Sequence, residues 1–242
     1  TLGIITYRTL STIARDLIYL ASGYLLDRPW VLFSTVFFVV VGSIHAALGP
    51  HPKHVKIMLP KLHPSMKGLR IAQLSDLHIG PGIRRAYVQK VAKRTMALAP
   101  DLITLTGDIG DGPVRVYSAD AEPFREMKAP LGVFYVSGNH EHYWGVEDWM
   151  DLMRGFGMQV LKNEVVRLKV NDSTLAIAGV PDPVSKIPPE VEKLGLSCAE
   201  ADFRVLLSHR PGVARAASKA GFNLQLSGHT HGGQFFPWTL VV

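Results

Sequence analysis

The sequence predicts an α/β domain preceded by a helical, membrane-associated segment. From residue 69 onward, short apolar runs alternate with patterns of helical period, which is typical of an α/β domain. Three apolar runs follow one another without a helix between residues 158 and 180, so part of the sheet is expected to be antiparallel or mixed. These changes of pattern divide the chain into the segment at residues 1–51, a linker at residues 52–68 and the domain at residues 69–242.

The apolar stretch at residues 30–49 predicts a membrane helix. Its twenty residues include no Asp, Glu, Lys or Arg. A helix of that length spans about 30 Å, the thickness of the hydrocarbon core of a bilayer. Trp30 suits an anchor at the membrane interface. A buried core helix is the alternative. Residues 17–26 are also apolar and could form an interfacial helix or the end of a further span.

The positive charge of the chain is concentrated near its N-terminus. The net charge is +6, and residues 1–67 hold seven Lys/Arg against two Asp/Glu. The remainder is nearly balanced, with 19 basic and 18 acidic residues. This distribution favours contact with membrane lipid and gives no reason to expect a nucleic-acid partner. Basic residues are denser after the apolar stretch than before it, which predicts that the domain lies on the cytoplasmic side of the membrane. In a bacterium this membrane would be the inner membrane.

The ends and the cysteine content add two expectations. The chain begins at Thr1 instead of Met and ends in an apolar run, so we expect both termini to be cut from a longer protein. The single cysteine, Cys198, excludes an internal disulfide and a metal site built from several thiolates. No feature of the sequence predicts an oligomeric state.

The elements of the domain follow from apolar periodicity. Eight short apolar runs are expected to form strands, at residues 69–74, 102–106, 133–137, 158–161, 165–170, 174–180, 204–208 and 224–227. Helices are expected at residues 84–99, 119–128, 146–156 and 212–220. The first of them carries Val88, Val91, Ala92 and Met96 on one side. The linker could hold a further short strand at residues 55–59.

Polar clusters follow five of these predicted strands. They are Asp76-Leu77-His78, Gly107-Asp108-Ile109-Gly110-Asp111, Gly138-Asn139-His140-Glu141, Ser208-His209 and Gly228-His229-Thr230-His231. Ligands gather at the carboxyl ends of strands in α/β sheets. Each cluster alone has another interpretation, since Asp108 can cap the next element and Asn139 can form a turn. Together they offer carboxylates, an amide and imidazoles but no thiolate, which suits Mn, Fe or Zn.

The five clusters, in this order, resemble the D-x-H, G-D-x-x-D, G-N-H-[DE], H and G-H-x-H motifs of the calcineurin-like metallophosphoesterase family. The resemblance covers residues 69–234. The apolar N-terminus and the GHTHGGQ run are similar to the membrane-anchored branch, which includes relatives of UDP-diacylglucosamine pyrophosphate hydrolases. The resemblance implies a metallo-dependent phosphatase fold, a two-sheet β-sandwich flanked by helices.

The resemblance also implies two divalent metal ions, with Mn expected first and Fe or Zn as alternatives. It assigns Asp76, His78 and His231 to one ion, Asn139, His209 and His229 to the second, and Asp108 to a bridge between them. His140 would give a proton to the leaving group, and Asp111 would orient His140.

The expected reaction is hydrolysis of a phosphodiester or pyrophosphate bond by metal-activated water, on a lipid-linked or nucleotide substrate. Protein phosphatases of the superfamily carry Arg after the second Asp of G-D-x-x-D, whereas Gly112 follows Asp111 here. Arg210 could contact an anionic substrate or face solvent. An apolar lip for a lipid tail could consist of Trp144, Trp149, Phe235, Phe236 and Trp238, although ordinary core and surface positions are the favoured interpretation of these aromatics. A catalytically silent, membrane-tethered scaffold and a soluble-nucleotide phosphodiesterase are the competing hypotheses.

Overall fold

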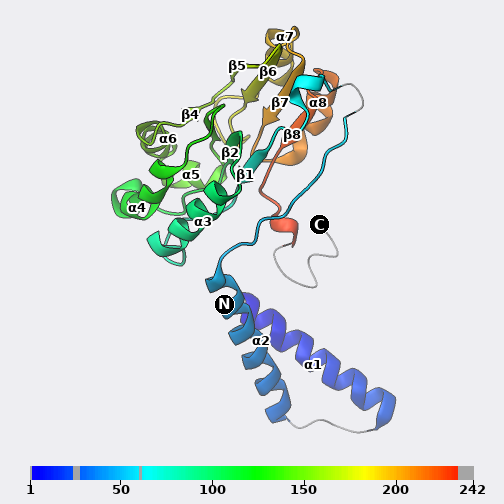
Figure 1. Ribbon diagram of the computed structural model, residues 1–242. Coiled ribbons are helices and arrows are strands. Elements are labelled where there is room, and N and C mark those ends of the chain that lie inside the picture. Colours follow the sequence, from blue (N-terminus) through cyan, green and yellow to red (C-terminus); the bar gives the residue numbers. More distant parts are fainter. Residues whose placement is uncertain (1, 24–27, 60–61, 234–242) are drawn as a thin grey trace. The chain divides into compact units, whose positions relative to one another are not determined.

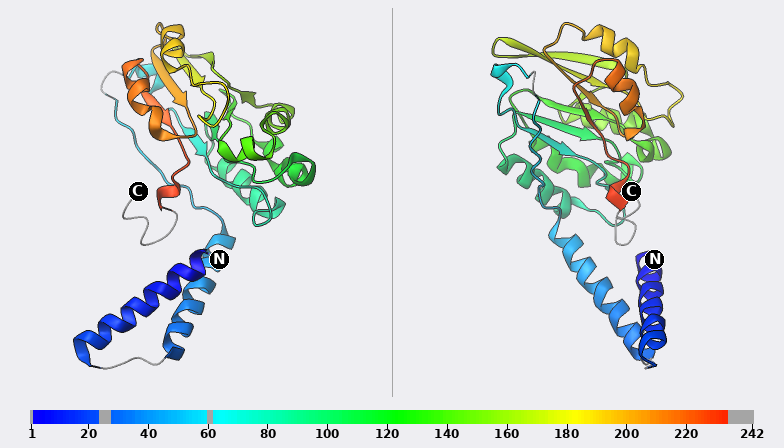
Figure 2. Two further views of the ribbon diagram at one scale, coloured as in Figure 1. Left: turned by 180° about the vertical axis from the view of Figure 1, so that it is seen from behind. Right: turned by 90° about the vertical axis from the view of Figure 1, so that its right-hand side faces the viewer.

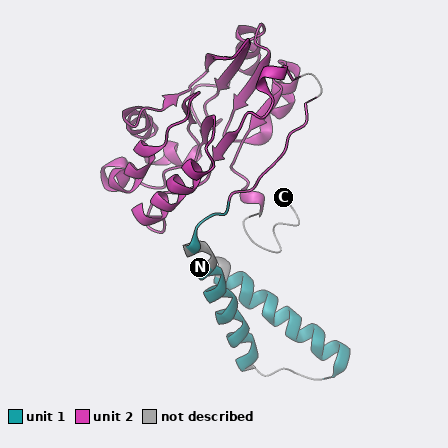
Figure 3. Ribbon diagram, viewed as in Figure 1, with its two compact units in different colours: residues 1–51 teal, residues 52–242 magenta. Residues whose placement is uncertain are grey.

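The chain divides into two compact units, Thr1–His51 and Pro52–Val242 (Figure 3). The computed structural model describes residues 2–23, 28–59 and 62–233. The last residues of the predicted domain, 234–242, lie outside the described part. Each unit has its own internal contacts.

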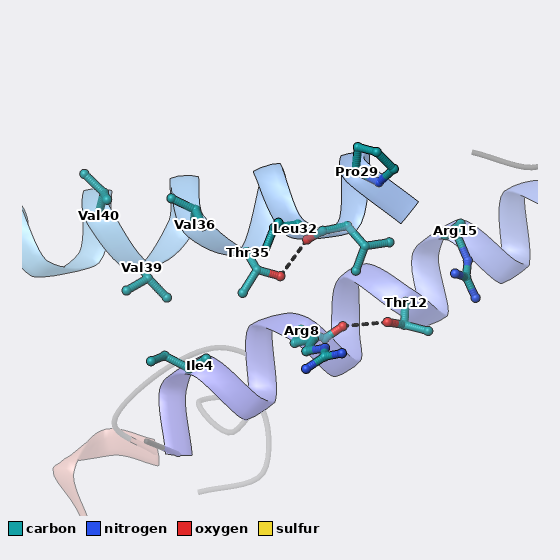
Figure 4. Close-up of a pocket in the computed structure, with 11 residues that line it drawn as sticks. Ile4, Arg8, Thr12, Arg15, Pro29, Leu32, Thr35, Val36, Val39 and Val40 are labelled. Carbon is teal, nitrogen blue, oxygen red and sulfur yellow. Dashed lines mark hydrogen bonds between the residues drawn. The ribbon is translucent and has the colours of Figure 1, made fainter. Parts of the chain in front are cut away.

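The first unit consists of two helices, α1 (Leu2–Ser22) and α2 (Arg28–Leu48). The rings of Tyr7 and Phe38 stack with their centroids 5.6 Å apart, and Ser34 donates a hydrogen bond to Ser11. Figure 4 shows a groove between the helices, with arginine and threonine side chains from α1 and valine side chains from α2. Thr35 Oγ1 donates to the backbone oxygen of Val31 in its own helix.

The surface of this helix pair is strongly apolar. Large side chains on both helices are exposed, among them Leu17, Leu20, Trp30, Leu32 and Phe33. Across the helices that the structure describes, none combines the length and the hydropathy required to traverse a bilayer. The helix predicted at residues 30–49 is present as α2, which ends at Leu48, and the predicted membrane span stays a prediction.

The second unit contains two four-stranded sheets (Figure 1). The first sheet is wholly parallel and consists, in spatial order, of β1 (Ile71–Leu74), β2 (Leu102–Thr106), β3 (Val133–Val136) and β4 (Gln159–Val160). The second consists of β5 (Glu164–Val170), β6 (Ser173–Gly179), β7 (Phe203–Leu207) and β8 (Leu224–Leu226). In it β5 and β6 are antiparallel, whereas the other pairs are parallel. All eight predicted strands and the predicted mixed sheet are therefore confirmed.

Helices cover the outer faces of the two sheets (Figures 1 and 2). On the first sheet lie α3 (Arg85–Ala97), α4 (Val114–Ala121) and α6 (Val146–Gly155), and α5 (Asn139–Trp144) precedes α6. On the second sheet lie α7 (Val191–Ser197) and α8 (Ala214–Lys219). Short 3-10 turns occur at Pro64–Met66, Glu122–Glu126, Pro211–Val213 and His231–Gly233. The predicted two-sheet sandwich flanked by helices is confirmed.

Alternation along the strands builds the three apolar layers of this sandwich. In β2, Ile103 and Leu105 pack beneath the helices, and Leu102 faces the second sheet. In β6, Ile177 faces the first sheet and Ala178 packs with α7 and α8. Neighbouring residues thus serve different layers, and a shift of one residue in strand register would exchange them.

Several predicted boundaries are wrong for local reasons. The helix expected at residues 119–128 is α4 followed by a 3-10 turn, because Pro123 has no N–H to continue an α-helix. The strand expected at residues 55–59 is absent, and its residues are mostly exposed without a described partner strand. The helix expected at residues 212–220 begins as a 3-10 turn, and α5 and α7 were not predicted.

Candidate metal centre

The five polar clusters come together at one end of the two sheets. They follow β1, β2 and β3 in the first sheet and β7 and β8 in the second. Backbone hydrogen bonds join successive loops, since the N–H of Asp76 donates to Gly107 and the N–H of His78 donates to Asp108. The N–H of Gly228 likewise donates to the backbone oxygen of His209. Parallel strand order therefore places residues that are far apart in the sequence side by side.

Five of the predicted ligands have a left-handed backbone. They are Asp76, His78, Asp108, His229 and His231, with φ between 51° and 74°. The described part of the chain has eight non-glycine residues with positive φ, so most of them lie in this centre. Such conformations cost about 1–3 kcal/mol each and persist where the surrounding structure enforces them, commonly at functional sites.

The first group of donor atoms consists of Asp76, His78 and His231. The Nε2 atoms of the two histidines lie 3.1 Å apart, and His231 Nε2 lies 3.4 Å from Asp76 Oδ1. Both oxygens of Asp76 accept the backbone N–H of His229, at 3.0 and 3.1 Å. The structure thus brings the three residues predicted for one ion within reach of a common point.

The second group consists of Asp108, His209 and His229, with Asn139 beside them. His209 Nε2 lies 3.2 Å from each of Asp108 Oδ2, Asn139 Oδ1 and His229 Nδ1. His209 Nδ1 donates to the backbone oxygen of Thr106 at 2.8 Å, so the neutral ring has its lone pair on Nε2. That lone pair faces a carboxylate and an amide oxygen, which are also acceptors. A cation at their centre would satisfy all of them, so this donor set fits a metal ion.

Asp108 lies between the two groups and is almost completely buried. Its Oδ2 is 3.2 Å from His209 and 3.9 Å from both His78 and His140. Its Oδ1 accepts the backbone N–H of His140 at 2.9 Å, which fixes the orientation of the carboxylate. Burial raises the pKa of Asp108, but the hydrogen bonds from His209 and His140 outweigh it and lower the pKa below its usual value.

His140 and Asp111 form a hydrogen-bonded pair at the edge of the groups. His140 Nδ1 lies 2.9 Å from Asp111 Oδ1, and the indole N–H of Trp144 donates to the same oxygen at 3.0 Å. Burial opposes ionisation of Asp111, but these two donors lower its pKa. Trp144 therefore supports this carboxylate, a contact that the sequence did not reveal. Trp149 is fully buried, so it belongs to the core and does not form part of an apolar lip, in agreement with the favoured interpretation.

The histidines of the two groups differ in their affinity for protons. Burial lowers the pKa of His78, and burial together with the charge of Arg210 lowers the pKa of His229. Burial also acts on His209, but the hydrogen bond and the charge of Asp108 prevail and raise the pKa of His209 above 6.5. Among these three, His209 is the one that holds a proton to the highest pH.

Glu141 organises the centre without pointing into it, and sequence reasoning gave it no role. Its side chain is fully buried and accepts four backbone N–H groups, those of Asp108, Ile109, Gly110 and Gly138, at 2.6 to 3.1 Å. Burial raises its pKa, and the hydrogen bonds from Gly110, Gly138 and Ile109 oppose that rise. The carboxylate thereby joins the loop after β2 to the loop after β3. The sequence signal for this role was the position of Glu141 three residues after Gly138, because an acid at that spacing can cap the N-terminus of a helix.

Replacing Glu141 by Gln is expected to lower the free energy of unfolding by about 2–4 kcal/mol, because an amide nitrogen cannot accept hydrogen bonds from buried N–H groups. Urea denaturation of the metal-free protein measures the change. Glu126→Gln is the matched control, since Glu126 is exposed. Equal stability of the two variants would show that the four hydrogen bonds are not needed.

Lowering the pH from about 8 to about 6 is expected to weaken Mn²⁺ binding, because His209 must lose its proton to offer Nε2 and its pKa is raised. Calorimetric titration with Mn²⁺ at several pH values measures this effect. His209→Gln should bind more weakly and show a flatter pH dependence. An unchanged affinity across the range in the unsubstituted protein would contradict the expectation.

Comparisons with known proteins agree with this geometry. The family model described as "Calcineurin-like phosphoesterase" matches residues 69–233. The zebrafish (Danio rerio) "Transmembrane protein with metallophosphoesterase domain" is 34% identical over 233 residues, which cover 91% of this chain and 53% of that protein. An "Uncharacterized metallophosphoesterase" of Aquifex aeolicus is 36% identical over 174 residues, covering 69% of this chain and 65% of the relative.

A solved structure of GAP50, "the anchor in the inner membrane complex of Plasmodium", aligns with a TM-score of 0.47 at 17% identity, over 66% of this chain and 65% of that one. The chain spans less than two thirds of the length of the two relatives above. The family model covers most of the chain and includes every cluster of the centre. This chain therefore belongs to the calcineurin-like phosphoesterase family.

Proposed function

We propose that this chain hydrolyses a phosphodiester or pyrophosphate bond with water activated by two divalent cations. The observation that carries the proposal is the convergence of acceptor atoms on His209 Nε2, each at 3.2 Å, next to a second group of donors that share Asp108 as a neighbour. Family membership supports the reaction class, because calcineurin-like phosphoesterases are metal-dependent phosphoester hydrolases.

We assign the ligands by their grouping. Asp76, His78 and His231 would hold one cation, Asn139, His209 and His229 the other, and Asp108 both. Oxygen and nitrogen donors without sulfur favour Mn²⁺, with Fe or Zn²⁺ as alternatives. Bound there, a pair of cations lowers the pKa of a shared water and neutralises charge on phosphate oxygens.

The residues around the ligands supply the proton chemistry. His140 Nδ1 is engaged by Asp111, which leaves Nε2 to face a substrate. A protonated imidazole at this position can give its proton to the departing oxygen. Trp144 keeps the Asp111 carboxylate in place through the same oxygen that His140 contacts. His140 is thus assigned as the general acid and Asp111 as its positioning residue.

Metal-dependent hydrolysis of bis(p-nitrophenyl) phosphate tests the assignment. His140→Ala is expected to keep its metal content and to lose about 10²–10⁴-fold in kcat, the usual contribution of a general acid. Asp108→Asn should lose both metal, measured by elemental analysis, and activity. His54→Ala, an exposed histidine outside both groups, is the control. Unchanged turnover in Asp108→Asn would reject the mechanism, and inactivity of the unsubstituted protein would favour a silent scaffold.

We further propose that residues 1–51 attach the chain to a membrane, with the domain on the cytoplasmic side. The exposed apolar side chains of α1 and α2 and the excess of basic residues in residues 1–67 support attachment to an anionic lipid surface. The name of the zebrafish relative, which calls it a transmembrane protein, also supports this attachment. A lipid-linked substrate would suit this location, and a soluble nucleotide is the alternative.

Flotation with phosphatidylglycerol vesicles tests the attachment. The chain is expected to float with the vesicles, and replacing Leu32 and Phe33 by Ser should reduce the floating fraction, because apolar burial drives insertion into the interface. Val55→Ser is the matched control, since Val55 is an exposed apolar residue of the other unit. If the unsubstituted chain does not float with the vesicles, membrane attachment is refuted.

A further inference from the structure

A buried carboxylate holds Arg210 beside the metal centre. Arg210 directly follows His209, and its Nε donates to Asp182 Oδ2 at 3.0 Å. Asp182 is completely buried in the loop after β6, and its other oxygen accepts the backbone N–H of Val184. A buried carboxylate that has a cationic partner fixes the position of that partner more firmly than a surface ion pair does. The guanidinium is therefore held in one place.

The outer end of this guanidinium is free to bind an anion. In the part of the chain that the structure describes, the side chain of Arg210 has a hydrogen-bonding partner at Nε, and none at its two terminal nitrogens. The side chain is about one-third exposed. Its positive charge is close enough to His229 to lower the pKa of that ring. Four N–H donors in a planar fork thus lack a protein partner among the described residues, near the second group of donors.

The loop after β2 carries no arginine directly after Asp111. Gly112 and Pro113 follow Asp111, so that loop offers no cation to a substrate. A phosphodiester has two non-bridging oxygens, and the proposed pair of cations would neutralise them. The fork of Arg210 is then available for the oxygens of a second phosphate group. An arginine fork matches the oxygens of a phosphate group in geometry and in charge.

We infer that Arg210 binds a second phosphate group of the substrate and selects for molecules that carry a diphosphate, with Asp182 as its positioning residue. The inference rests on the proposed function, because it places the first phosphate at the metal centre. Discrimination is expected in substrate binding, since Arg210 does not touch the reacting atoms. The competing explanation is a structural one, in which Arg210 and Asp182 only tie the loop after β6 to the loop after β7.

Kinetics with two substrates separate these explanations. Bis(p-nitrophenyl) phosphate carries one phosphate, and ADP-ribose carries a diphosphate. Arg210→Gln is expected to raise KM for ADP-ribose about tenfold or more, the usual effect of losing a charged hydrogen bond, and to change KM for the diester less than about twofold. Arg210→Lys should restore part of the difference, because it keeps the charge but loses the fork. Arg215→Gln, an exposed arginine on α8, is the control.

Binding without turnover provides a second readout. Calorimetry with ADP and with inorganic phosphate, at matched free Mn²⁺, should show weaker ADP binding in Arg210→Gln and Asp182→Asn but unchanged phosphate binding. If the unsubstituted protein hydrolyses neither substrate, the proposed function fails, and the ADP titration still decides the role of Arg210. Equal losses for both substrates and both ligands, with a lowered melting temperature in Arg210→Gln and Arg210→Lys alike, would overturn the inference in favour of a structural tie.

Discussion

The centre depends on the hydrogen bonds that the buried Glu141 carboxylate accepts from four backbone N–H groups. Those bonds fix the loops that carry Asp108 and Asn139. The left-handed backbone of Asp108 is unfavourable by itself, so it requires such an external constraint. One side chain that would touch neither metal nor substrate thus determines where the proposed bridging carboxylate lies.

The glycines of the clusters also help to position the ligands, because they allow the backbones of neighbouring loops to approach closely. Gly107 has φ of 85°, and a side-chain carbon there would lie 2.6 Å from His209 Nδ1 and from the backbone nitrogen of Gly138. A larger residue would separate the second sheet's histidine from the first sheet's loops. Close contact between the backbones, which only glycine permits, lets His209 reach both Asp108 and Thr106.

The sequence predicted the sheets well and the supporting contacts poorly. Apolar runs such as residues 102–106 are buried on both faces and read clearly as strands. Pro123 lacks a backbone N–H, and this is the local reason why the α-helix predicted at residues 119–128 gives way to a 3-10 turn. The site residues were recognisable because each follows a strand and has ligand chemistry. The contacts of Asp182 and Trp144 could not be predicted from the sequence. Their partners lie 28 and 33 positions away in the chain, and no local spacing connects such residues.

Both proposed cations would take ligands from both halves of the sandwich. Asp76 and His78 extend from the first sheet, whereas His231 extends from the second, and the second group is divided in the same way between Asp108 and His209. Ligand binding to a folded state stabilises that state. Metal ions held in this way would fasten one sheet to the other, so that loading the centre would also resist separation of the two halves of the sandwich.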